Sequence, residues 1–272
     1  MFKNKIAEDI IKKIEMKIYK NEKIKIDDIE KISGYSRRYI QFIFKEKTGM
    51  TISTYIRKRR LSHAAILIRL TRKSIFHIAM DLNFSSLQSF TRSFTREFKI
   101  SPLQYRNDEF FDCSCLTPPF TFDTQRYLLK KEWLHSKKLS VKEFTLTESL
   151  IGSRLDRAKK IRKEDIFKIT ALNKEAFVIT EMHPLSTIDH NVTLKTFIGF
   201  ENDEYNYEIK SQKCWILEFI GEWIDYVAFG RFLTFNINIE LGNTIIEKIE
   251  LISNGECNDT QKYRAEIYLP VQ

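Results

Sequence analysis

Two stretches of this chain each place Arg and Gln side chains along one side of an expected helix. In the helix from about residue 36 to 47, Ile40, Ile43 and Phe44 share one side at about 100° per residue. The opposite side carries a mainly polar set: Arg37, Arg38, Gln41, Phe42 and Lys45. Arg can donate two bonds to guanine and Gln can pair with adenine, and each such pair gives about 1–3 kcal/mol of discrimination. The pattern predicts contacts with base edges in a major groove.

The same chemistry returns in the expected helix from about residue 86 to 98. There Phe90, Phe94 and Phe98 form the buried stripe, and the other side is polar: Gln88, Thr91, Arg92, Thr95 and Arg96. A single helix of this kind is more often a solvated charged face. Because the pattern occurs twice, a pair of base-reading helices is the better interpretation.

The charge of the chain is divided between its two ends. Residues 1–107 contain 24 Lys and Arg against 10 Asp and Glu, a net charge of +14. Residues 108–272 contain 21 Lys and Arg against 26 Asp and Glu, a net charge of −5. A basic segment of this kind predicts a module that binds a polyanion, and the paired helices point to duplex DNA. Between the two helices, the run Arg57 to Arg60 is expected to contact phosphates through Arg57 and Arg60.

The first 105 residues are predicted to be almost entirely helical. Apolar residues at helical spacing and Ser or Thr at the starts indicate helices over 6–19, 26–32, 36–47, 51–70, 74–82 and 86–98, with a short one from Ser101-Pro102. A short helix, a turn and a longer helix thus occur twice, at 26–47 and 74–98. The long helix 51–70 is expected to hold these two units at a fixed separation.

Beyond the helices, the character of the sequence changes. Pro118-Pro119 indicates a linker, which we expect over 111–121, between a first domain at 1–110 and a second at 122–272. The second domain is rich in β-branched and aromatic residues, with strands expected near 139–146, 176–182, 192–200, 214–219 and 265–271. Helices are expected near 158–172 and 226–238. This order predicts an α+β domain with an internal duplication.

Several functional classes lack support in the sequence. There is no phosphate-binding loop, no set of His residues at metal-ligand spacing, no membrane-spanning run and no secretory signal. We therefore expect no cofactor, no metal and no membrane partner, and a cytoplasmic protein associated with the nucleoid. The four cysteines are expected to be reduced thiols: Cys113, Cys115, Cys214 and Cys257. Redox sensing by Cys113 and Cys115 is the alternative.

The helical segment resembles the DNA-binding domain of AraC/XylS-type bacterial regulators. The resemblance is carried by Ser33 to Gly49 (SGYSRRYIQFIFKEKTG), Tyr55 to Leu61 (YIRKRRL), Asn83 to Phe98 (NFSSLQSFTRSFTREF), and the pairs Ser101-Pro102 and Tyr105-Arg106. The N-terminal position of this domain is similar to the layout of Rob-type members. The overall fold is thus expected to be an all-α double helix-turn-helix domain followed by an α+β domain.

That resemblance implies a mode of DNA binding. A monomer would place one helix of each unit in successive major-groove segments, about 34 Å apart. The residues at the base-reading positions would be Arg38, Gln41 and Phe42 in the first unit, and Gln88, Ser89, Thr91 and Arg92 in the second. Three positions depart from the Rob-like pattern: Arg38 replaces a Trp, Phe42 an Arg and Leu87 a Gln. The target sequence is therefore not carried over.

The second domain resembles GyrI-like domains through Tyr263 to Val271 (YRAEIYLPV) and Gly221 to Tyr226 (GEWIDY). Such domains imply a cleft that takes amphipathic or cationic small molecules, which aromatic walls and one carboxylate would suit. Glu266 is the candidate carboxylate, and the candidate walls are Trp215, Trp223, Tyr226 and Tyr268. A domain used only for partner contact or stability is the alternative.

Three functions follow from these observations. The first is a sequence-specific transcription regulator, an activator that contacts RNA polymerase. The second is a GyrI-like hydrolase of small electrophiles, in which Glu266 would act with Tyr268 or Tyr226. The third is a non-specific architectural DNA binder, which a preference of about 10³-fold for one site over random duplex would exclude.

Overall fold

The computed structural model describes residues 2–20, 22–108, 110–120, 129–149, 156–183, 191–226, 229, 233, 237, 239–253 and 261–271. The chain forms two compact units. The first comprises Met1–Asp108 and Cys115–Gln125, and the second comprises Glu109–Ser114 and Arg126–Gln272. The helical region followed by a curled antiparallel sheet confirms the predicted fold class.

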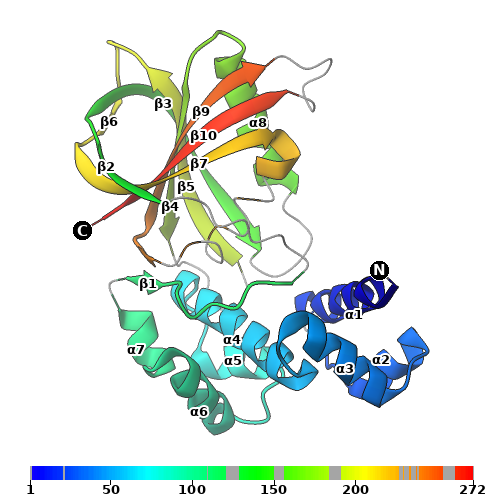
Figure 1. Ribbon diagram of the computed structural model, residues 1–272. Helices are drawn as coiled ribbons and strands as arrows, with labels where there is room; N and C mark the ends of the chain where they lie inside the picture. The colour runs from blue at the N-terminus through cyan, green and yellow to red at the C-terminus, as the bar shows by residue number, and fades with distance from the viewer. Residues whose placement is uncertain are drawn as a thin grey trace. The chain divides into compact units, whose positions relative to one another are not determined.

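The described part of the first unit is built from helices (Figure 1). They are α1 Phe2–Tyr19, α2 Ile26–Ser33, α3 Arg37–Thr48, α4 Ile52–Leu70, α5 Ile75–Asp81, α6 Leu87–Phe98 and α7 Pro102–Asn107. Five of them start in the same way. A Ser or Thr side chain accepts the backbone N–H three residues on, and these caps are Ser36, Thr51, Ser74, Ser86 and Ser101. Such caps satisfy backbone donors that the first helical turn leaves unpaired.

Two apolar stripes hold this unit together. The isoleucines of α1, from Ile6 to Ile18, are buried against Ile40, Ile43 and Phe44 of α3. The phenylalanines of α6 are buried as well, and Phe94 and Phe98 contact Tyr105 of α7. Both stripes agree with the sequence prediction.

The structure shows that α3 and α6 are equivalent elements separated by 50 residues. Each has 12 residues, and their caps are Ser36 and Ser86. Both end in a left-handed residue, Gly49 with φ 71° and Lys99 with φ 67°. The connecting α4 has 19 residues, about 28 Å at 1.5 Å per residue. It contacts α3, α5 and α6.

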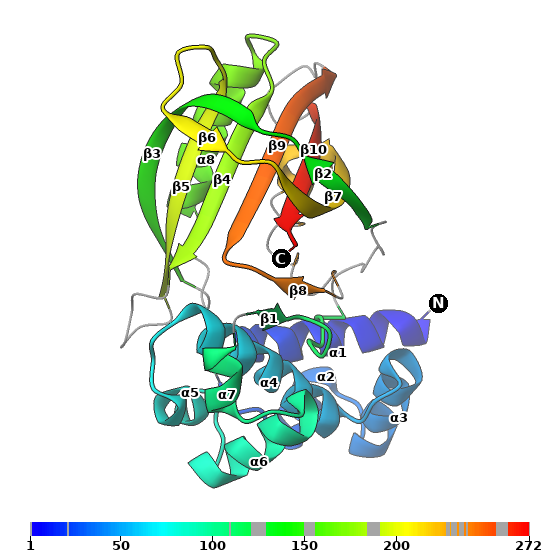
Figure 2. The ribbon, with the colours of Figure 1, turned by 90° about the vertical axis from the view of Figure 1, so that its left-hand side faces the viewer.

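The second unit is built on one eight-stranded antiparallel sheet, ordered β2-β7-β10-β9-β4-β5-β3-β6 (Figure 2). Its elements are β2 Lys130–Leu134, β3 Lys137–Ser149, α8 Asp156–Thr170, β4 Ala176–His183, β5 Asn191–Glu201, β6 Tyr207–Ile209, β7 Gln212–Glu222, β9 Thr244–Ser253 and β10 Lys262–Pro270. Helix α8 packs against β3, β4, β5 and β9. The predicted helix 226–238 lies mostly outside the described residues, although 223–226 are helical.

The sheet curls because its two edges are joined by the chain. β2 continues into β3 and β6 into β7, while β2 pairs with β7 and β3 pairs with β6. The two bent ribbons therefore run side by side around the curl (Figure 1). Where they bend, the N–H of Ser136 donates to the hydroxyl of Ser211 at 2.8 Å. The inner surface is apolar, with Phe177, Ile179 and Tyr268 among its buried residues.

The stretch predicted as a linker is divided between the two units. β1 Phe111–Asp112 pairs with β8 Glu240–Leu241 in the second unit, whereas residues 115–120 belong to the first. Cys113 is a buried free thiol, and burial together with the charge of Asp112 raises its pKa well above the usual range. A raised pKa opposes formation of the reactive thiolate, which disfavours the redox alternative for Cys113. Cys257 lies outside the described residues.

Candidate DNA-binding interface

Helix α3 is fixed at its N-terminal end and along one side. The Ser36 hydroxyl accepts the N–H of Tyr39 at 3.4 Å. The carboxylate of Glu30 on α2 accepts the N–H of Arg37 at 2.8 Å, so α2 and α3 are also joined by a polar bond. The inward side is closed by Ile40, Ile43, Phe44 and Thr48, all buried. These constraints leave only the opposite side of α3 to solvent.

The outward side of α3 carries the residues expected from the sequence. Arg37, Arg38, Phe42 and Lys45 are exposed, and Gln41 is half-buried. Phe42 is 55% exposed, and the Nζ of Lys3 lies 5.7 Å from the centre of its ring. Within the part of the chain that the structure describes, the four polar side chains of this set have no hydrogen-bond or ion-pair partner. The surface is therefore available to a ligand that is rich in acceptors.

Helix α6 presents a matching surface. Its inward side consists of Phe90, Phe94 and Phe98, whose rings follow one another at 5.6 and 4.4 Å between centres. Outward, the exposed residues are Gln88, Arg92 and Arg96, and the half-buried ones are Ser89 and Thr91. Among the described residues, the side chains of Gln88, Arg92 and Arg96 have no hydrogen-bond or ion-pair partner. The structure thus repeats an unpaired cationic surface on an equivalent helix.

The basic run of α4 differs from these surfaces. Lys58 pairs with Glu97 of α6, and Arg59 pairs with Glu15 of α1 at 2.9 Å. Arg60 donates to the backbone carbonyl of Glu22 at 3.3 Å. Only Arg57 of the four lacks a partner among the described residues. Three cations of the run, including Arg60, are thus engaged within the protein, and the phosphate contacts predicted for Arg57 and Arg60 stay a prediction.

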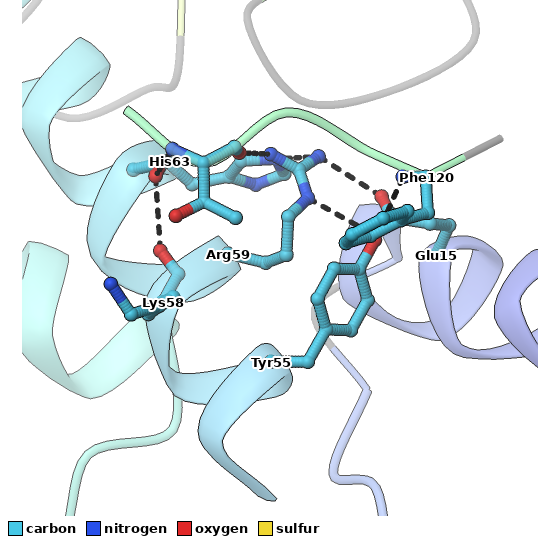
Figure 3. Close-up of polar contacts among 8 residues, drawn as sticks. Glu15, Tyr55, Lys58, Arg59, His63 and Phe120 are labelled. Carbon is cyan, nitrogen blue, oxygen red and sulfur yellow. Dashed lines mark hydrogen bonds and ion pairs between the residues drawn. The ribbon is translucent and has the colours of Figure 1, made fainter. Parts of the chain in front are cut away.

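Arg59 lies at the centre of a buried polar network between α1 and α4 (Figure 3). It is 3% exposed, and its Nε and Nη2 both donate to Glu15 at 2.9 Å. The Tyr55 hydroxyl donates a hydrogen bond to the same carboxylate. Burial and the charge of Glu15 raise the pKa of Tyr55 well above its usual range. Burial and Arg59 lower the pKa of His63 to about 3, so its ring is neutral.

In the second unit, an aromatic cluster forms on the sheet face that packs against α8. Trp223 contacts Tyr226, Phe167 of α8 and Tyr263 of β10, with ring centres 5.4–6.0 Å apart. The Tyr226 hydroxyl donates a hydrogen bond to Glu247 of β9, which also pairs with Arg162 of α8. Burial and the charge of Glu247 raise the pKa of Tyr226 well above its usual range.

The structure does not bring the five predicted ligand residues together. Side chains alternate along a strand, so Glu266 and Tyr268 point away from the face of Tyr263 on which Trp223 and Tyr226 pack. Trp215 shares the face of Phe219, which contacts Tyr226. The five residues therefore lie on two faces of the sheet, and their role as ligand residues stays a prediction.

The charge of Glu266 is already paired within the protein. Its carboxylate accepts a hydrogen bond from the Tyr268 hydroxyl and pairs with Lys248 at 2.8 Å. Burial alone would raise the pKa of Glu266, but the bonds from Lys248 and Tyr268 outweigh burial and lower it. A ligand cation that pairs with Glu266 must therefore displace Lys248, and a general base at Glu266 must lose the bond from Tyr268.

Sequence reasoning missed Glu247 and the buried role of Arg59. Glu247 follows the buried Ile246 in β9, so no alternation of polar and apolar residues marks it. Arg59 lies within a run of four cations that reads as a solvated face. Its partner Glu15 is 44 residues away, and only the spacing of Tyr55 and Arg59 on one helix side hinted at a shared environment.

Two absences are limited to the described residues. Within those ranges, no group of three or more His, Cys, Asp or Glu side chains could hold a metal ion. In the same residues, no helix is both long enough and apolar enough to cross a membrane.

Comparison with known proteins points to the same helices. Residues 29–108 match the family model described as a helix-turn-helix domain. The HTH-type transcriptional regulator YkgA of Escherichia coli K12 is 42% identical over 126 residues, 46% of this chain and 52% of YkgA. The regulatory protein SoxS of the same strain is 43% identical over 107 residues, 39% of this chain and 98% of SoxS.

A solved structure is also similar to part of the chain. It is a transcriptional regulator of Chromobacterium violaceum described as containing an AraC-type DNA-binding domain, 30% identical, with a TM-score of 0.34. The match covers 36% of this chain and 89% of that one. The chain spans about half the length of YkgA, and the similarity to SoxS takes in nearly all of that shorter protein.

Proposed function

The chain belongs to the AraC-type family of helix-turn-helix transcription regulators, and on that basis we propose that it reads specific duplex sites with α3 and α6. One observation carries the proposal. The cations on the outward sides of these two helices are unpaired among the described residues, while Lys58, Arg59 and Arg60 on the connector are engaged within the protein. Unpaired Arg and Gln side chains on two equivalent helices suit two successive major-groove segments.

The proposed site has no internal symmetry. One chain supplies both reading helices, so a monomer covers the whole site. Their outward residues differ, so the two half-sites differ in sequence. Symmetric sites belong to proteins that bind as two-fold dimers. Selection from random duplexes should therefore return a non-palindromic sequence with its halves about 34 Å apart.

The test compares Gln41→Ala and Arg92→Ala with Lys47→Ala, in the full chain. Each reading variant should lower affinity for the selected site by roughly 5- to 150-fold, since a good pair is worth about 1–3 kcal/mol, and should largely spare random duplex. Lys47 is on α3 but pairs with Glu8, so its loss controls for charge. Equal losses on both duplexes would indicate a non-specific architectural binder.

We also propose that the protein is an activator that contacts RNA polymerase at the nucleoid in the cytoplasm. The support is the family, whose relatives here are named as regulators. In vitro transcription from a promoter carrying the selected site should rise with added protein. A fall in transcript would mean repression instead.

For the second unit, we propose a site for an amphipathic cation at Glu247 rather than Glu266. The support is a buried carboxylate, 9% exposed, beside the rings of Trp223 and Tyr226. A ligand cation would take the place of Arg162 on Glu247 and gain cation–π attraction. Calorimetry with tetraphenylphosphonium should show binding that Glu247→Gln abolishes and Glu266→Gln spares. Binding that Glu266→Gln abolishes and Glu247→Gln spares would instead make Glu266 the counter-charge of the ligand.

We propose no enzymatic activity. Glu266, the residue on which a hydrolase would depend, is bound by Lys248 and Tyr268. Turnover of small electrophiles by the protein, abolished by Glu266→Gln, would overturn this.

A further inference from the structure

Residues 115–120 cross one side of α4 as an extended segment, here called the strap. Ser62 accepts the N–H of Thr117 at 2.8 Å, and Arg59 donates to the Thr117 carbonyl at 2.7 Å. Tyr55 accepts the N–H of Phe120 at 3.1 Å, and their rings are 5.6 Å apart. Tyr55, Arg59 and Ser62 are spaced by four and three residues, so one side of α4 binds the strap backbone.

Two of the three residues that bind the strap also bind α1. Arg59 and Tyr55 both reach Glu15 of α1 beneath the strap (Figure 3). Tyr55, Arg59 and Ser62 are 0%, 3% and 1% exposed. Without the strap, the Tyr55 oxygen, one Arg59 nitrogen and the Ser62 oxygen would each lose a partner in a largely buried site. Loss of partners in such a network is costly, so the strap and the α1–α4 contact depend on each other.

This network bears on one reading helix more than on the other. Helix α1 packs against α3 through the isoleucine stripe, so α1 and α4 together seat α3. Helix α6 instead packs against α4, α5 and α7. A weaker contact between α1 and α4 should therefore displace α3 more than α6.

The strap is connected covalently to the second unit. Residues 109–114 belong to that unit, and only residues 113–116 separate the end of β1 from Thr117. The alignment with SoxS covers 98% of that relative in 107 residues, which leaves no room for a second unit. A domain of this family is thus found without such a partner.

We propose that Tyr55, Arg59 and Ser62 are positioning residues for α3, and that the strap they bind transmits the state of the second unit to the first reading helix. With the strap seated, α1 and α4 hold α3 in place. A pull on residues 113–116 unseats it and weakens reading of the α3 half-site. The inference rests on the proposed DNA-binding function.

The first test uses Thr117→Pro in the full chain. Proline has no N–H, so the bond to Ser62 is lost while the Thr117 carbonyl position is kept. Amide exchange in α1 and α4 should quicken at least tenfold. Affinity for the selected site should fall about five- to tenfold, hydroxyl-radical protection should be lost over the α3 half-site, and binding to random duplex should be unchanged. Ser62→Ala removes the same bond from the α4 side and should have the same effects. It replaces the proline variant as the test if that variant does not fold.

The second test changes the length of the connection. Deletion of Ser114 shortens the four-residue stretch and should raise exchange in α1 and α4, whereas insertion of four Gly-Ser residues after Ser114 should not. Unchanged exchange or unchanged half-site protection in folded Thr117→Pro and Ser62→Ala would overturn the positioning role. No effect of the deletion would overturn the link to the second unit. If the wild-type protein selects no sequence, the proposed function itself fails.

Discussion

The two reading helices have the same frame but different outward chemistry. Ile40 and Phe44 of α3 correspond to Phe90 and Phe94 of α6, and all four are fully buried. The outward positions match less well: Arg38 with Gln88, Gln41 with Thr91, and Phe42 with Arg92. Packing therefore accounts for the large apolar residues at the inward positions, whereas no packing contact requires the outward residues of the two helices to match. The two helices are thus one scaffold with two different outward surfaces, which under the proposed function would read two unlike half-sites.

The largest expected effect tests whether the scaffold is equivalent in the two helices. Phe44→Ala and Phe94→Ala should each lower the free energy of unfolding by about 3–5 kcal/mol, because each leaves a cavity in a packed stripe. Urea denaturation of the full chain, with amide exchange in α3 and α6, measures both losses. A loss below about 1 kcal/mol at only one position would show that the two helices are packed differently.

The outward difference can be removed by one substitution. Phe42→Arg gives α3 the residue that α6 has at the equivalent Arg92. Since Arg donates two bonds to guanine, the variant should gain about 1–3 kcal/mol for guanine at one position of the α3 half-site. Repeated site selection measures this shift, and the α6 half-site should stay the same. A change in both halves would contradict independent reading.

Both helices depend on α4, and this dependence should appear as a pH effect. Burial and Arg59 lower the pKa of His63 to about 3, against about 6.5 in the unfolded chain. Between about pH 6.5 and pH 3, His63 therefore binds a proton in the unfolded state but not in the folded state. This contribution to stability is complete above pH 6.5 and falls by about 1.4 kcal/mol per pH unit as the pH drops toward 3.

Unfolding measured at pH 7 and pH 5 should thus differ by roughly 2 kcal/mol from this residue. His63→Leu should remove that part of the pH dependence. His77 is exposed on α5, so His77→Gln serves as the control and should leave the dependence intact. Persistence of the full difference in His63→Leu would assign the effect to other groups.

The helical frame was predictable because its signals are local. The stripe of Phe90, Phe94 and Phe98 and the cap at Ser86 lie within a few residues of one another, and α6 begins one residue after that cap. The strap was not predictable, since Pro118-Pro119 indicates only a break in helix and the bond from the Thr117 N–H to the Ser62 hydroxyl joins residues 55 apart. Burial of Arg59 likewise depends on a distant partner.

The ligand residues of the second unit show a different limit. Resemblance pointed to Glu266 because of its place in the last strand. Strand alternation puts residues 263 and 266 on opposite faces, but the sequence does not say which face the helices cover. That choice depends on where α8 packs, and Phe167 of α8 stacks on Tyr263. The same contact leaves Glu266 on the other face, beside Lys248.

The smallest expected effects concern the equivalent ends of α3 and α6, where the two helices differ by one residue type. Gly49 and Lys99 both adopt left-handed backbone, which costs a residue with a Cβ about 1 kcal/mol or more. Gly49→Ala should therefore destabilise the first unit by about 1 kcal/mol, although no atom lies within 4 Å of the added Cβ.

Lys99→Gly should have the opposite sign. It relieves the strained backbone but loses the bond from the Lys99 ammonium to the Arg96 carbonyl at 3.0 Å, and glycine also adds freedom to the unfolded chain. The balance should be a gain of about 0.5 kcal/mol, seen as a rise in the urea midpoint. Destabilisation by both substitutions would mean that the Lys99 side chain contributes more than its backbone costs, and that the two helix ends are not equivalent.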